Sequence, residues 1–458
     1  MSKIDKPLFW NTYKKEYISL LKLGFPVLIT QLGIIIVGFA DTMMVGMYGT
    51  QELAAASFVN NFFMVPIVML IGFASGITPL VGALFSQKKY FETGQILRVS
   101  TQLNAFVGIF FSVVMALLYF FLDYMGQPQE LMPLIKQYYI IVLFTLFPIS
   151  IFNCYQQMAN GITDTAMPMW LMLMMNFTNI IGNYVLIFGK FGCPELGLPG
   201  AGISTLTSRW LGTILIVFLV MRRKRYKPYI DGLYMNAGLR TERKLVFRTS
   251  YPVMIQSGIE TILWSLGAIV CGWFGAIELA GYQVIVTISQ LGFMTYISFG
   301  VATSIRVANY IGINDFAMVR RISSAGLHIN LLLGTLASLI FLFATKWILG
   351  AFTTDLDVIA TALLLIPPLI LYQYGDAIQI TYANALRGTS EVKPLLWISI
   401  VCYICIGIPL LLLFSVVLNG KSAGVFYSFS GALFAAAFFL SKAYKNTIRR
   451  RESALKEA

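Results

Sequence analysis

The sequence predicts an all-α integral membrane protein with twelve transmembrane helices, arranged as two six-helix lobes related by a pseudo-twofold axis along the membrane normal. Three observations predict this class. First, 58% of the 458 residues are hydrophobic and only 12% are charged, whereas about a quarter of a soluble protein is charged. Second, apolar runs long enough to cross a bilayer recur along the whole chain. Third, the two halves of the chain are related by an internal repeat.

The apolar runs predict six spans in each half, joined by short polar or glycine-rich links. In the first half they cover residues 18–45, 53–81, 99–122, 134–158, 167–189 and 199–221, and in the second 247–271, 279–306, 322–346, 358–385, 393–416 and 423–442. One long link, from Arg222 to Val246, is strongly basic. We therefore expect an N-terminal lobe over residues 1–221, a basic cytoplasmic linker over 222–246, and a C-terminal lobe with a basic tail over 247–458.

The net charge of +13 is typical of nucleic-acid-binding proteins, but its distribution favours a membrane protein without a nucleic-acid partner. The basic residues lie between the spans, as the positive-inside rule requires. If both termini are cytoplasmic, the opposite side receives, of the 33 Lys and Arg residues, only Lys136, Lys190, Lys346 and Lys421. We expect a multi-pass protein of the cell membrane, the inner membrane of a bacterium, with both termini in the cytoplasm.

The internal repeat has a period of 226 residues. This shift aligns Pro26 with Pro252, Gly46 with Gly272, Gly49 with Gly275, Glu52 with Glu278, Thr163 with Thr389 and Pro168 with Pro394. Six spans per repeat is an even number, so the repeats are parallel, and transporters built in this way bind substrate between their halves. A duplicated enzyme or scaffold is the alternative, so the repeat alone favours transport only in part.

Three acidic residues fall inside predicted spans: Asp41, Glu260 and Asp376. A charge at mid-bilayer costs about 2.5–3.5 kcal/mol on insertion scales, so such a residue faces a cavity or a partner. Structural ion pairs are one explanation, and Arg209 and Arg306 are the candidate partners inside spans. Because the three carboxylates outnumber these cations, we favour a role in binding a coupling ion or substrate.

A carboxylate removed from water can take up a proton, hold Na⁺ with neighbouring oxygens, or neutralise a lipophilic cation. One site can therefore bind ion and drug in turn, which is the basis of antiport. Tyr372 lies one helical turn before Asp376, and Asn179 and Asn183 have the same spacing, although hydrogen bonds between helices would explain the amides as well. Gln31, Gln256 and Gln283 are further candidates for the lining of a substrate cavity.

Other features bear on the local structure and on the chemistry. The pair Pro367-Pro368 predicts a break in the tenth span ahead of Asp376, because proline cannot continue a helix hydrogen-bond ladder. A protein-bound zinc site is not expected, since the chain has one histidine and five scattered cysteines. We find no nucleophile–base pair or phosphate loop of an enzyme, and no repeated filter sequence of a channel.

Four sets of motifs occur along the chain: Gly38-Phe39-Ala40-Asp41-Thr42, Gly46-Met47-Tyr48-Gly49 and its repeat, Gly161-Ile162-Thr163-Asp164-Thr165, and Leu386-Arg387-Gly388-Thr389. With them, the chain resembles the multidrug and toxic compound extrusion (MATE) family over nearly its whole length. Carboxylates in the first, seventh and tenth spans together resemble the NorM branch of this family. The first-half link departs from the usual Arg-Gly pair, because Asn160 precedes Gly161.

The resemblance implies export of small organic cations driven by inward Na⁺ or H⁺, with no cofactor beyond the coupling ion. It implies a cation site in the C-terminal lobe formed by Glu260, Asp376 and Tyr372. Asp41, Asn179, Asn183 and Thr205 would form the site of the N-terminal lobe. Na⁺ would bind at Glu260, Asp376 or Asp41.

A flippase for lipid-linked oligosaccharides is the alternative function with a similar architecture. A protein that moves pyrophosphate lipids should carry several Arg or Lys in its central cavity, whereas the buried charge here is acidic. The residues leave open whether Na⁺ or H⁺ couples, which lobe binds the drug, and what the physiological substrate is. The sequence carries no sign of oligomerisation, and we expect a monomer.

Overall fold

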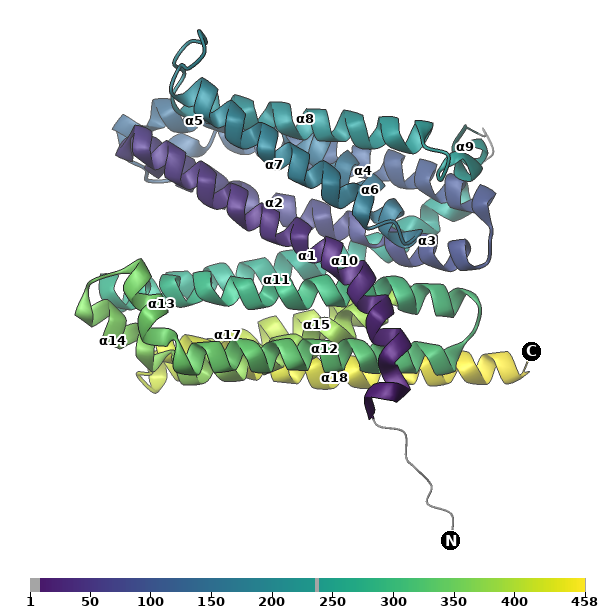
Figure 1. Ribbon diagram of the computed structural model, residues 1–458. Coiled ribbons are helices and arrows are strands. Elements are labelled where there is room, and N and C mark those ends of the chain that lie inside the picture. Colours follow the sequence, from purple (N-terminus) through teal and green to yellow (C-terminus); the bar gives the residue numbers. More distant parts are fainter. Residues whose placement is uncertain (1–8, 235–238, 458) are drawn as a thin grey trace. The chain divides into compact units, whose positions relative to one another are not determined.

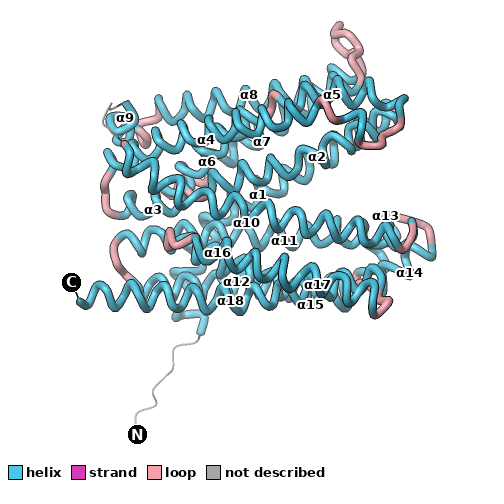
Figure 2. Tube along the Cα trace, turned by 180° about the vertical axis from the view of Figure 1, so that it is seen from behind, coloured by secondary structure: helices cyan, strands magenta, loops and turns pink. Residues whose placement is uncertain are grey.

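The computed structural model describes residues 9–234 and 239–457, and within them the chain is helical without a strand (Figures 1 and 2). Eleven helical segments of the described chain are long and apolar enough to cross a membrane, or twelve if one bent pair counts as a single span. Each of them coincides with one of the twelve predicted spans. The predicted fold class is therefore confirmed.

The spans of the first half are formed by α1 (Phe9–Tyr48), α2 (Thr50–Ser75) with α3 (Ile77–Ser86), α4 (Tyr90–Tyr119), α5 (Met132–Leu143) with α6 (Leu146–Gly161), α7 (Ala166–Ile187) and α8 (Leu198–Arg222). Those of the second half are α10 (Arg240–Trp273), α11 (Ala276–Gly312), α12 (Phe316–Phe343), α14 (Leu356–Leu364) with α15 (Ile366–Gly388), α16 (Lys393–Ser399) continued by η3 (Ile400–Gly407), α17 (Ile408–Leu412) and η4 (Leu413–Val417), and α18 (Lys421–Glu457). Two further helices, α9 (Lys227–Tyr234) and α13 (Thr345–Phe352), lie outside the spans, and the short helices η1 (Leu122–Tyr124) and η2 (Gln129–Leu131) precede α5.

Contacts group the chain into two compact units. One comprises Ile29–Gly258, and the other joins the chain up to Leu28 to the chain from Ile259 onward. Both boundaries fall inside long helices, α1 and α10, close to the prolines Pro26 and Pro252. This grouping leaves the predicted lobe limits, 1–221, 222–246 and 247–458, as a prediction.

The repeat is visible in the backbone of the links. Lys88, after α3, has φ 59°, and Asn314, after α11, has φ 58°, and these two positions are 226 residues apart. In the next pair of links the left-handed residues are Thr163, with φ 62°, and Ser390, with φ 63°. The left-handed residue of the second link thus lies one position after Thr389, which the repeat aligns with Thr163.

The tenth span is broken, as the two prolines predict. Helix α14 ends at Leu364, α15 begins at Ile366, and their axes differ by 47°. Pro367 and Pro368 lie in the first turn of α15, where a missing N–H costs nothing because that group has no partner inside the helix. Helix α15, which carries Tyr372 and Asp376, packs against α11, α12 and α18 (Figure 1).

The segment predicted as a basic linker contains helix α9, which packs against α4. Tyr226 and Tyr229 are buried in the hydrophobic core of this unit. The two helices cross at glycines: a Cβ on Gly94 would lie 2.1 Å from the Tyr229 carbonyl oxygen, and one on Gly232 would lie 2.0 Å from that of Phe91. The first part of the linker is thus anchored, and residues 235–238 lie outside the described chain.

Candidate functional site

Asp41, Asn179, Asn183 and Thr205 lie together within the first unit, brought there from α1, α7 and α8. Asn183 Nδ2 donates to Asp41 Oδ1 at 2.5 Å. With the Asn179 amide oriented by its hydrogen-bond partners, its nitrogen donates to the same carboxylate oxygen at 2.8 Å and its oxygen accepts from Thr205 Oγ1 at 3.1 Å. Two neutral amides therefore hold this carboxylate.

Burial gives this cluster its electrostatic character. Asn179 and Asn183 are buried and Asp41 is half-buried, so the carboxylate is largely removed from water. Within the described chain, the Asn183 Oδ1 atom has no hydrogen-bond partner. A buried acceptor beside a carboxylate suits a cation with oxygen ligands, and the four residues together fit Na⁺ or a proton.

Arg209 lies one helical turn after Thr205 on α8. Its Nη1 donates to Thr145 Oγ1 at 2.5 Å, at the break between α5 and α6, and its charge acts on Asp41 electrostatically. The ion pairs found among the described residues do not include Asp41 or Asp376. Direct structural pairing, the alternative left open by the sequence, does not explain these two carboxylates.

The second unit brings Glu260 of α10 together with side chains of α15 and η3. Tyr403 donates its hydroxyl to Glu260 Oε1 at 2.9 Å, and Gln379 Nε2 donates to the same oxygen at 3.2 Å. Gln379 Nε2 also lies 3.0 Å from the Tyr403 hydroxyl. The three groups thus form one closed hydrogen-bonded set around the carboxylate.

Asp376 belongs to the same neighbourhood. Tyr372 donates its hydroxyl to Asp376 Oδ2 at 3.3 Å, as the helical spacing predicts. Asp376 is 3% exposed and interacts with Glu260 as a like charge. Two carboxylates in one desolvated site cannot both remain charged at low cost unless a cation or a proton neutralises one of them.

Aromatic rings form the apolar wall of this site. Tyr372 is buried and meets Trp264 edge-on, with ring centroids 5.3 Å apart. Phe429 packs on the same indole at 4.6 Å. These rings exclude water from the carboxylates, and an aromatic face attracts an organic cation.

Two residues of this site escaped the sequence analysis. Gln379 lies three residues after Asp376, so helical spacing on α15 could have indicated it. Tyr403 lies in a nearly continuous apolar run, where no periodicity distinguishes it from a packing residue. The π-helical turn η3, a conformation frequent at functional sites, carries it toward Glu260.

The predicted cavity glutamines have different surroundings. Gln256 is buried, Gln31 is partly buried and Gln283 is exposed. No hydrogen bond between described residues joins Gln31 or Gln283 to the acidic clusters. The described chain also contains no group of three or more His, Cys, Asp and Glu side chains that could hold a metal ion.

The comparisons with known proteins agree with this architecture. The MatE family profile matches twice, at residues 26–185 and 252–413, so the two matches begin one repeat period apart. The multidrug resistance protein NorM of Photobacterium profundum is 28% identical over 406 residues, which cover 87% of this chain and 88% of that protein. A probable multidrug resistance protein NorM of Mannheimia succiniciproducens is 28% identical over 415 residues and covers 89% of this chain and 88% of that protein.

The fold likewise has solved counterparts. A mutant of a Vibrio cholerae MATE transporter superposes with a TM-score of 0.86 at 16% identity, covering 96% of this chain and 98% of that chain. A likeness at this identity shows the fold, and the profile, which matches well over half of the chain, shows the family. The chain therefore belongs to the MatE family, the multidrug and toxic compound extrusion family of membrane transporters.

Proposed function

We propose that the protein is a secondary active antiporter that exports small organic cations and drugs in exchange for Na⁺ or H⁺. The observation that carries the proposal is the pair of the partly buried Glu260 and the buried Asp376, two like charges without a countercharge at Asp376 among the described residues. Such a pair favours a proton, Na⁺ or an organic cation. The relatives named as multidrug resistance proteins support the choice of drugs as substrates.

The chemistry of exchange follows from charge balance. A cation or proton bound at Glu260 and Asp376 removes the repulsion between the two carboxylates. When the cation or proton leaves, the repulsion returns. The driving ion and the organic cation therefore compete for the same carboxylates. The Asp41 cluster offers a second such site in the other unit, where Asn179 and Asn183 stabilise the charged form by donating hydrogen bonds.

No cofactor is required beyond the coupling ion in this proposal. The side chains supply carboxylate, hydroxyl and amide groups, which are ligands that Na⁺ and protons share. The protein would act as a monomer in the inner membrane of a bacterium, with both termini in the cytoplasm. The distribution of basic residues between the spans supports that orientation.

Transport in proteoliposomes tests the proposal. Purified protein should expel ethidium against the ethidium gradient when a Na⁺ gradient is imposed at equal pH on both sides, or when a pH gradient is imposed without Na⁺. Glu260→Gln and Asp376→Asn should each lower gradient-driven export at least tenfold, and Asp41→Asn should lower it as well, because each removes a carboxylate charge that binds the cation.

Asp123→Asn is the matched control, since it removes a carboxylate that pairs at 2.8 Å with Lys136 at an exposed position. This variant should transport like the wild type. Absence of gradient-driven ethidium movement in well-folded wild-type protein would refute the antiporter. Full coupling in all three site variants would refute the assignment of the site while leaving transport intact.

A further inference from the structure

Each unit contains, within itself, a similar contact that the sequence analysis did not predict. It lies at the link after α6 in the first unit and at the link after α15 in the second. In the first unit, Asp164 Oδ2 accepts the Tyr226 hydroxyl at 2.9 Å and lies 3.7 Å from Arg225 Nε. Arg225 Nη2 also lies 3.3 Å from the Ile162 carbonyl oxygen and 3.4 Å from that of Thr163. One arginine thus contacts both an acid and the backbone of the link.

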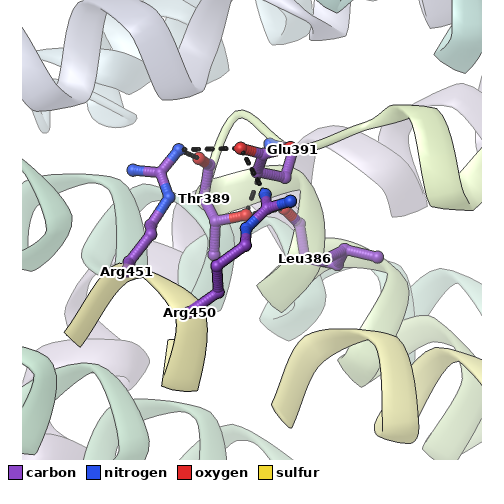
Figure 3. Close-up of polar contacts among 5 residues, drawn as sticks. All are labelled: Leu386, Thr389, Glu391, Arg450 and Arg451. Carbon is purple, nitrogen blue, oxygen red and sulfur yellow. Dashed lines mark hydrogen bonds and ion pairs between the residues drawn. The ribbon is translucent and has the colours of Figure 1, made fainter. Parts of the chain in front are cut away.

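The second unit repeats this arrangement on α18. Glu391 Oε1 lies 3.0 Å from Arg450 Nη2 and 3.6 Å from Arg451 Nη2. Arg451 Nη2 also donates to the Thr389 carbonyl oxygen at 2.8 Å. Figure 3 shows both arginines reaching from α18 to the same link, where the Thr389 hydroxyl donates to the Leu386 carbonyl at 2.7 Å.

The correspondence between the two contacts is close. Arg225 and Thr163 are 62 residues apart, and so are Arg451 and Thr389. In both links the acid directly follows the residue with left-handed backbone, Thr163 or Ser390. Carbonyl groups at the end of a helix have no partner inside it, and a cation placed there satisfies them. We call each set, Arg225 with Asp164 and Arg451 with Glu391, an arginine clasp.

Each clasp lies on helices that carry one of the carboxylate sites. The link of the second unit follows α15, with Asp376 and Gln379, and leads through α16 to Tyr403 on η3. The link of the first unit leads into α7, with Asn179 and Asn183, and its arginine follows α8, with Thr205. At about 1.5 Å per residue, Gln379 is about 14 Å along α15 from the end of the helix at Gly388.

We propose that Arg225 and Arg451 are positioning residues for transport. By holding a link against the turn that follows α8 in the first unit, or against α18 in the second, each clasp sets the register between the helices whose side chains meet at the carboxylate. The clasps do not touch the transported ion. The role of the clasps in transport rests on the proposed antiport. Their role in setting the helix register does not.

Ion dependence of transport is the first test. Arg451→Gln should raise the apparent KM for the coupling ion about fivefold and leave the maximal rate per folded protein within twofold, because the site keeps its groups but loses their register. Arg451→Lys, which keeps the charge near Glu391, should recover most of the affinity. Arg449→Gln, an exposed arginine on the same helix, is the matched control and should behave like the wild type.

Labelling of native cysteines gives a readout that does not depend on transport. Cys402, next to Tyr403, and Cys154, on α6, are both buried. Arg451→Gln should raise N-ethylmaleimide labelling of Cys402 severalfold, quantified by peptide mass spectrometry, and leave Cys154 unchanged. Arg225→Gln should do the reverse, with the exposed Lys224→Gln as its control.

The outcomes separate the two proposals. A wild type that shows no ion-driven transport, together with reciprocal labelling, refutes the antiporter and supports the clasps as elements that set helix register. Wild-type KM and wild-type labelling in both arginine variants overturn the clasp proposal. An equal rise in labelling of both cysteines also overturns it, because the arginines would then stabilise the fold as a whole.

Discussion

At the scale of single residues, the carboxylates of both units are held by neutral hydrogen-bond donors. Asp41 accepts from two asparagines, and Glu260 accepts from Tyr403 and Gln379. A neutral donor stabilises a buried charge without cancelling it. The site therefore keeps a negative charge for an incoming cation, which a fixed lysine or arginine partner would remove.

Tyr403→Phe tests the weight of one such donor. The substitution keeps the ring and removes the hydroxyl at 2.9 Å from Glu260. A hydrogen bond to a charged group contributes about 1.5–3 kcal/mol and here stabilises the charged carboxylate. If the coupling ion is a proton, its apparent affinity should therefore rise about tenfold or more; if it is Na⁺, the affinity should fall, because the site loses a neighbouring oxygen. Initial rates of ion-driven efflux against ion concentration measure this. Tyr382→Phe, at a partly buried tyrosine that packs against Tyr444, should leave the affinity unchanged. Equal changes in both variants would contradict the role of Tyr403.

How much of the site could be predicted depended on the kind of residue. Asp41, Glu260 and Asp376 stand out because a charge inside an apolar span is expensive. Asn179 and Asn183 stand out for a similar reason and because of their helical spacing. Tyr403 carries no such signal, since a tyrosine in an apolar run packs equally well in a core, and only the tertiary fold places its hydroxyl at Glu260.

At the scale of elements, several helices that carry or contact residues of the site are interrupted. The prolines predict the break before α15, because their chemistry forbids a regular ladder. The break between α5 and α6, where Arg209 meets Thr145, was not predicted, although Pro148 lies in the first turn of α6 as Pro368 does in α15. Helix α9 was also missed, since its charged start indicates a linker and its attachment depends on two glycines distant in sequence.

Gly232→Val tests the attachment of α9. The added side chain would collide with the Phe91 carbonyl, and because this partner is backbone, the helices must separate. Overpacking of this kind costs about 1–3 kcal/mol, so the thermal midpoint should fall and trypsin should cut faster between Arg222 and Lys227. Gly350→Ala, at an exposed position with nothing near its Cβ, should change neither. Slow cleavage in Gly232→Val would show that α9 is held by other contacts.

At the scale of the whole molecule, hydropathy predicts the spans well because the thickness of the bilayer sets the length of every crossing element. The repeat predicts their parallel arrangement in two halves. Orientation depends on charge alone: the basic residues concentrate on one side of the predicted spans. The orientation therefore has a test of its own.

Cysteine accessibility in spheroplasts measures it. The native Cys193, in the link between α7 and α8 and partly exposed, should react with a membrane-impermeant maleimide from outside. A cysteine introduced at Lys224, in the basic segment, should react only after the membrane is permeabilised. Labelling of the introduced cysteine in intact spheroplasts would show that the topology is the reverse of the predicted one.

The paired clasps also bear on the history of the chain. Arg225 follows α8 and Arg451 lies near the end of α18, each at the same distance in sequence from its link. An ancestral half that already carried this arginine in its tail would, on duplication and fusion, leave one copy between the halves and one at the end. The basic segment between the halves is then a former C-terminus that became internal. A gene for the second half alone, complete with its own clasp, would come nearest to the ancestral protein.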